Sequence, residues 1–96
     1  MAIFAHSALQ GITTDQYDAL NAELRKLPGD PFAGCLSHVC IPSSSGLHIL
    51  DLWESEEAME KFGTIVMPIA ERLGLPRSQE PPTISKVHSY WVPGVA

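Results

Sequence analysis

Apolar and polar residues alternate with a period of two along much of the chain, as they do in β-strands. The alternation is clearest in residues 46–54, which form the best-defined predicted strand. One face of this strand would carry Leu47, Ile49, Asp51 and Trp53. The same period predicts three more strands, over residues 2–9, 34–41 and 83–92. Because the strand over residues 46–54 is largely apolar on both faces, we expect it to be covered on both sides.

Two stretches between these strands have the spacing of amphipathic helices instead. The first begins at Thr13, which forms a capping-box pattern with Gln16, and it ends before a Pro-Gly-Asp-Pro run. Its apolar positions are Tyr17, Leu20, Leu24 and Leu27. The second begins after Ser55, a favourable N-cap residue. Pro68 lies inside this second helix and predicts a kink or two joined segments.

The order of the predicted elements is βαββαβ, which makes residues 1–96 a single α+β domain. Right-handed crossovers would turn this order into a ferredoxin-like fold, a four-stranded antiparallel sheet with both helices on one face. The opposite face would then be exposed, although its candidate residues include Trp53, Leu36 and Ile49. We therefore expect two copies to pair through their sheets and close into an α/β barrel.

A cluster of serines and a glycine separates the second and third predicted strands. Such a cluster between two apolar runs predicts a β-hairpin. If residues 43–46 form a four-residue loop, Pro42 pairs with Leu47, and every other pair in the hairpin follows from this one.

This register brings together side chains that could carry chemistry. It places His38 opposite Asp51, and Leu36 opposite Trp53, on one face of the sheet. A histidine oriented by a carboxylate is a typical general base, with His38 taking the proton and Asp51 fixing the tautomer. The same pair would also serve as a buried hydrogen bond that fixes the strand register, and the pattern leaves both interpretations open.

Further candidate ligand contacts lie on the first and fourth strands. Lys86, His88 and Tyr90 share one face of the fourth strand, and they would point either into the barrel or along a solvated edge. The side chains of the opposite face are smaller and more apolar, and we expect them to pack under the helices. His6 would add a third imidazole to the pocket or be a core histidine. Trp53 would be a wall of an aromatic-ligand pocket or part of the core.

Composition narrows the range of partners. The net charge of −5, with only six scattered basic residues, argues against binding to nucleic acid or to acidic membranes. No apolar run approaches transmembrane length, and the N-terminus lacks the cationic region of a signal peptide. Cys35 and Cys40 would lie roughly 16 Å apart along one strand, too far to bridge, and two unpaired thiols favour a reducing cytoplasm. None of the four histidines has a metal-ligand spacing, so we expect no metal. No P-loop or dinucleotide fingerprint is present, so we expect no other cofactor.

The predicted hairpin and the helix after it resemble a known family. The resemblance rests on residues 34–39, on the run from Leu50 to Ala58, and on the helix start at residues 59–62. Its most specific part is the Trp-Glu-Ser-Glu-Glu-Ala junction between strand and helix. This pattern is similar to that of the small dimeric α/β-barrel proteins, which include the antibiotic-biosynthesis monooxygenases. In element order the similarity covers nearly the whole chain.

The resemblance implies a homodimer with a ligand cavity either between each sheet and its own helices or inside the barrel. Members of the family oxidise polycyclic phenols to quinones without metal or flavin, and others cyclise polyketides, degrade haem or only bind small molecules. It also implies that Trp53, at the end of its strand, lines the pocket. The haem-degrading members carry a histidine ligand on the second helix, and residues 56–73 contain no histidine.

Three hypotheses about function remain. The first is a cofactor-independent oxygenase or cyclase of secondary metabolism that acts on an aromatic, polyketide-like molecule. Its base would be His38 oriented by Asp51, with Trp53 and Tyr90 holding the rings. Its further ligand contacts would be Leu36, His6 and His88. The second hypothesis is a dimeric protein that binds such a molecule without turnover, and the third is an interaction module whose exposed sheet face is only a dimer interface.

Overall fold

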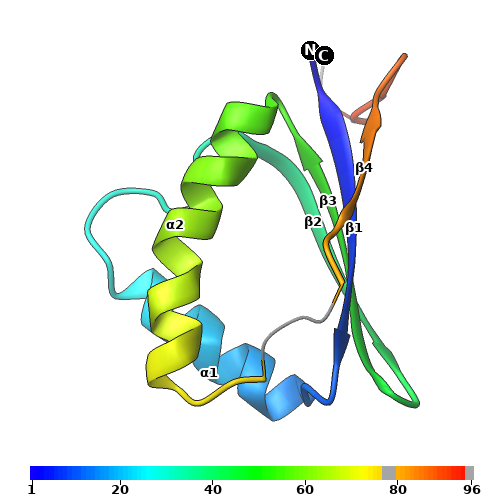
Figure 1. The fold of residues 1–96 in the computed structure, drawn as a ribbon. Helices are drawn as coiled ribbons and strands as arrows, with labels where there is room; N and C mark the ends of the chain where they lie inside the picture. Colours follow the sequence, from blue (N-terminus) through cyan, green and yellow to red (C-terminus); the bar gives the residue numbers. More distant parts are fainter. Residues whose placement is uncertain (77–79, 95–96) are drawn as a thin grey trace.

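The computed structural model describes residues 1–76 and 80–94 of the chain. Its elements are β1 (Ile3–Gln10), α1 (Thr14–Arg25), β2 (Cys35–Ser43), β3 (Gly46–Trp53), α2 (Glu56–Arg72) and β4 (Thr83–Lys86). Both helices lie on one side of the sheet and leave the other face uncovered (Figure 1). The predicted ferredoxin-like α+β fold is therefore confirmed for a single copy of the chain.

The strands form one antiparallel sheet in the order β2-β3-β1-β4. The predicted hairpin register is confirmed, since Pro42 pairs with Leu47. The turn itself is shorter than expected, because Ser43 also pairs with Gly46 and only residues 44–45 connect the strands. This difference of two residues leaves the parity unchanged, so the side chains near the turn keep their predicted faces.

Both helices begin with the caps that the sequence predicts. The Thr13 hydroxyl accepts from the Gln16 N–H at 3.1 Å, and the Gln16 side chain accepts from the Thr13 N–H at 2.9 Å. Ser55 caps α2 by accepting from the N–H of Ala58. α2 continues through Pro68 as one helix, so the expectation of two joined segments is wrong, and the proline removes only one backbone donor. Neither helix of the described chain is long and apolar enough to cross a membrane.

The helices cover the sheet face that carries Trp53 and Ile49, which is the reverse of our expectation. Trp53 is only 1% exposed and belongs to a cluster covered by Met59 and Phe62 of α2. Burial of a large aromatic side chain stabilises the fold more than burial of a small one, because more apolar surface leaves water. The helix layer provides this burial within a single copy of the chain. The exposed large apolar residues of the outer face are Phe4, Val39 and Ile41.

The fourth strand ends at Lys86 instead of continuing to Val92 as predicted. Its partner explains the difference, because Lys86 pairs with Ile3, the first residue of β1. One further backbone bond, from the Val87 N–H to the Ala2 carbonyl at 3.0 Å, extends this edge. Residues 87–92 are not paired as a strand, so the alternating pattern alone does not make one.

Candidate functional site

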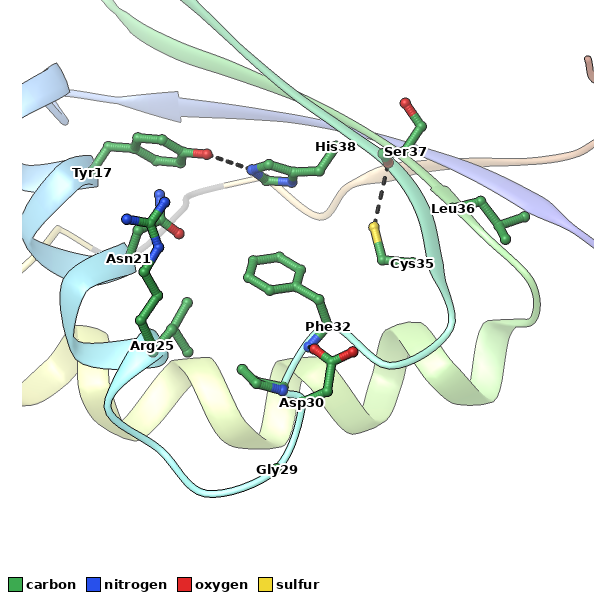
Figure 2. Close-up of a pocket in the computed structure, with 12 residues that line it drawn as sticks. Tyr17, Asn21, Arg25, Gly29, Asp30, Phe32, Cys35, Leu36, Ser37 and His38 are labelled. Atoms are coloured by element: carbon green, nitrogen blue, oxygen red, sulfur yellow. Dashed lines mark hydrogen bonds between the residues drawn. The ribbon is translucent and has the colours of Figure 1, made fainter. Parts of the chain in front are cut away.

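Three side chains from three elements form a continuous hydrogen-bonded chain on the helix side of the sheet. Asp51 Oδ1 lies 2.5 Å from His38 Nδ1, and His38 Nε2 lies 2.5 Å from the Tyr17 hydroxyl. Asp51 lies on β3, His38 on β2 and Tyr17 on α1, and Figure 2 shows the bond between Tyr17 and His38. The predicted pairing of His38 with Asp51 is confirmed, and its face is the one under the helices.

The partners in this chain determine where its protons lie. An ionised carboxylate only accepts, so Asp51, which is 8% exposed, receives the Nδ1–H of His38. When the imidazole is neutral, its Nε2 accepts from the Tyr17 hydroxyl. Burial raises the pKa of Tyr17, although the neighbouring Asn21 side chain opposes this effect, so the phenol keeps its proton at neutral pH. In its neutral form the imidazole can take up a proton at Nε2, and the carboxylate is placed to stabilise the imidazolium that results.

Phe32 packs beside the imidazole and holds it in place. Its ring centroid lies 5.4 Å from that of His38 and 4.6 Å from that of Phe62 on α2. The loop that carries Phe32 is fixed by the Asp30 carboxylate, which accepts the Phe32 N–H at 3.0 Å. Gly34 has a φ of +89°, and a Cβ there would lie 2.6 Å from a side chain of α2, so glycine allows this loop to approach the helix.

Two hollows meet at His38, Tyr17 and Phe32. The inner one lies between the sheet and the helices, has a volume of about 400 Å³ and also has Asp51 and Trp53 in its wall. The outer one has a volume of about 590 Å³ and is formed by α1, the loop before β2 and the start of β2 (Figure 2). Both volumes suit a small organic molecule. A ligand in either hollow would therefore meet the Tyr17–His38 pair.

Trp53 contributes to both the core and the inner hollow. Its ring centroid lies 5.4 Å from that of Phe62. Its indole Nε1 is buried and has no hydrogen-bond partner among residues 1–76 and 80–94. Buried N–H groups are rarely left without an acceptor, so this unpartnered donor is an exception within the core.

A β-bulge removes Leu36 from its predicted pair. The register shifts between Cys35 and Ser37, so Cys35 stands opposite Trp53 and the predicted pairing of Leu36 is wrong. Leu36 is 40% exposed and lies at the edge of the outer hollow, pointing away from His38 (Figure 2). A bulge inserts one residue into one strand only, and a count along the sequence does not detect it.

The structure does not bring the remaining predicted contacts to His38. His6 lies on the outer face of β1, where its Nε2 is 3.2 Å from Nδ1 of His48. His88 and Tyr90 follow the end of β4 and are exposed, and neither lines the inner or the outer hollow. Alternation along β1 explains the position of His6, and the early end of β4 explains the other two.

The faces of β4 also differ from the expectation. Ile84 pairs with Ala5, and Lys86 pairs with Ile3. Because Ala5 and Ile3 are buried under the helices, Ile84 and Lys86 share the helix-side face, not the opposite one.

The two cysteines are free, and neither is an activated nucleophile. Burial, with a smaller contribution from the charge of Asp51, raises the pKa of Cys35 to about 11. Burial also raises the pKa of Cys40. Thiols that stay protonated at neutral pH are poor nucleophiles. In the described part of the chain, no group of three or more His, Cys, Asp or Glu side chains could hold a metal ion.

Sequence reasoning missed two residues of this site, Tyr17 and Phe32. Tyr17 carried a usable signal, because a tyrosine on the apolar stripe of a helix needs a hydrogen-bond partner when buried. The facing sheet offered His38 as that partner once the helices were placed over it. Phe32 lies in a loop, and no periodic pattern predicts its position.

Comparison with protein-family models and with curated proteins gave no match. Among solved structures, the chain is similar to a monooxygenase from the ActVA-Orf6 gene of Streptomyces coelicolor, solved in complex with the ligand nanaomycin D. The TM-score is 0.52 at 20% sequence identity, over 97% of this chain and 92% of that chain. The two proteins share the ferredoxin-like fold. This agrees with the fold that the sequence predicted. Rv0793 from Mycobacterium tuberculosis is also similar, with a TM-score of 0.45, 17% identity and coverage of 97% of each chain.

Proposed function

We propose that the protein is an enzyme that removes a proton from an aromatic, polyketide-like small molecule and so activates it for reaction with O₂. The observation that carries the proposal is the chain from Asp51 through His38 to Tyr17, which ends at two hollows of suitable size. The nanaomycin D bound to the structurally similar monooxygenase supports this class of substrate. We further infer a cytoplasmic location, where the free thiols of Cys35 and Cys40 stay reduced.

The proton would pass through the Tyr17 hydroxyl. His38 Nε2 is already occupied by Tyr17 at 2.5 Å, and Tyr17 lines both hollows, so the Tyr17 oxygen would accept the substrate proton. The substrate proton moves to this oxygen while the original phenol proton moves to His38 Nε2. Asp51 stabilises the imidazolium that results. The base is thus His38, and Tyr17 connects it to the substrate.

The following step needs O₂ as the second substrate. A hydroxyanthrone that loses a proton from its methylene carbon becomes a carbanion, which passes one electron to O₂. The two radicals combine to form a peroxide, and the proton returns to it from the relay. Loss of water then leaves a carbonyl at that carbon, so one O₂ yields one quinone and one water. The substrate itself supplies all the electrons.

Oxygen uptake with dithranol, a dihydroxyanthrone, tests the proposal. We expect the protein to raise the initial rate about 10²-fold or more above that of the buffer alone, with saturation as dithranol increases. The product should be the corresponding dihydroxyanthraquinone, identified by its absorbance and mass. Saturable binding of dithranol without a rise in oxygen uptake would contradict the enzyme and indicate a binding protein.

We also propose that the protein is a homodimer joined through the outer face of the sheet. This face exposes large apolar residues, with Phe4 at 37%, Val39 at 45% and Ile41 at 47% exposure. These side chains come from β1 and β2, which flank β3 in the sheet, so they belong to one surface (Figure 1). An apolar surface of this kind is typical of an interface.

Val39→Asp should convert the dimer into a monomer, because it would bury an unpaired carboxylate in the proposed interface. Light scattering coupled to gel filtration measures the mass directly. Leu73→Asp is the matched control, since Leu73 is 38% exposed at the end of α2, on the helix layer. A wild-type protein with monomeric mass, or a Val39→Asp variant with dimeric mass, would contradict this interface.

A further inference from the structure

A row of polar side chains runs from the Tyr17–His38 pair to the mouth of the outer hollow. Asn21 and Arg25 follow Tyr17 on α1 at intervals of four residues, so the three lie on one side of the helix, and all three line the hollow. Figure 2 shows the Asn21 and Arg25 side chains extending toward the same space as Tyr17. Side chains of a helix tilt toward its N-terminus, so the guanidinium of Arg25 reaches back toward the Tyr17 hydroxyl.

Arg25 supplies a positive charge that no carboxylate neutralises within the described residues. The cations near it are paired: Glu23 binds Lys26 at 3.1 Å and Arg72 at 3.2 Å. Among residues 1–76 and 80–94, no ion pair includes Arg25. Asp30 also lines the hollow, but it lies apart from Arg25 in Figure 2 and accepts a backbone N–H of its own loop. The outer hollow therefore combines an unpaired guanidinium with an aromatic wall.

We propose that Arg25 and Asn21 form a subsite for the carboxylate of an aromatic acid whose rings lie against Phe32 and His38 in the outer hollow. A guanidinium can bind a carboxylate through two parallel hydrogen bonds, and the Asn21 amide offers a further donor. Phe32 provides a ring surface for stacking. This inference rests on the proposed function and narrows its substrate class to molecules with a carboxylate roughly 5–11 Å from the reacting atom, or one to two helical turns.

Two ligands that differ in one substituent, which is charged in one and neutral in the other, test the subsite. Rhein is a dihydroxyanthraquinone carboxylate, and aloe-emodin is the same ring system with a hydroxymethyl group instead. Isothermal titration of the full chain should show rhein binding about tenfold more tightly than aloe-emodin, as a charge-assisted pair at a partly exposed site provides. Arg25→Gln should remove this preference and leave the affinity for aloe-emodin unchanged. Arg25→Lys should keep part of it, since the charge remains without the planar fork.

Lys26→Gln is the matched control, because it makes the same change of charge one residue along. The Lys26 side chain is 71% exposed and pairs with Glu23, outside the hollow. The Lys26→Gln variant should retain the preference for rhein. Equal binding of the two ligands by the wild type, a preference that survives Arg25→Gln, an equal loss in Lys26→Gln, or no binding of either ligand would each overturn the subsite. An Arg25-dependent preference without oxygen uptake from dithranol would instead support the subsite and reject the oxygenase.

Discussion

Replacement of His38 by glutamine should lower the rate of dithranol oxidation roughly 10²–10⁴-fold, the range typical for loss of a general base. Glutamine keeps a polar side chain of similar size, but it cannot accept the substrate proton. Asp51→Asn should also reduce the rate, because it removes the charge that stabilises the imidazolium. Initial rates of oxygen uptake measure both effects. Circular dichroism spectra and urea midpoints close to those of the wild type would show that the fold is intact.

The chain offers matched controls for this experiment. His88→Gln repeats the change made at His38, and Tyr90→Phe repeats the Tyr17→Phe change described below. Both positions are exposed and lie beyond β4, so both variants should retain the wild-type rate. A loss of activity in either control would show that the replaced residue takes part in the site. Activity of His38→Gln within a few-fold of the wild type would reject His38 as the base.

Tyr17→Phe separates two routes for the proton. If the proton passes through the hydroxyl, as proposed, this variant should lose as much activity as His38→Gln. If the substrate reaches His38 Nε2 directly, removal of the hydroxyl would vacate that position and the rate would change little. A Tyr17→Phe variant with near wild-type turnover would therefore contradict the relay while leaving His38 as the base.

The sequence allowed the central part of the site to be predicted, because a short turn fixes a hairpin. A Ser-rich turn after Pro42 sets the pairing of β2 with β3, and parity then places His38 opposite Asp51. The observed turn is two residues shorter than expected, and an even difference keeps the same side chains together. A difference of one residue would have separated the pair.

Other parts of the site depend on contacts that local patterns do not encode. The bulge beside Leu36 moves Cys35 opposite Trp53 and shows no sequence signature. The length of β4 depends on where β1 begins, since Lys86 pairs with Ile3 at the first residue of that strand. Tyr17 reaches His38 only because α1 lies over that face of the sheet. Each of these features is determined by a partner distant in sequence.

The same sheet face has to provide both stability and a cavity. Ile3, Ala5 and Trp53 form a packed cluster with α2, and Ala5 and Trp53 also line the inner hollow together with Asp51 and His38. Asp51 is a buried carboxylate, and the His38 imidazole provides its hydrogen-bond partner. The packed cluster therefore holds the sheet against α2, while the polar pair lies at the wall of the same hollow.

Trp53→Ala should lower the free energy of unfolding by about 3–5 kcal/mol, the largest effect we expect for any single substitution in the core. Trp53 is 1% exposed and contacts the cluster that joins the sheet to α2, so its loss leaves a large cavity between the two layers. A small domain has only about 5–15 kcal/mol of total stability, so much of it would be lost. Urea denaturation followed by far-UV circular dichroism measures the change without relying on tryptophan fluorescence.

Trp91→Ala is the matched control, since Trp91 is 87% exposed and should change the stability by no more than about 0.5 kcal/mol. Trp53→Phe should recover most of the stability, because a phenyl ring fills much of the indole volume. It should still weaken the binding of dithranol if the unpartnered Nε1–H serves the ligand. A loss below about 1 kcal/mol in Trp53→Ala would show that this residue is not the packing centre between sheet and helix.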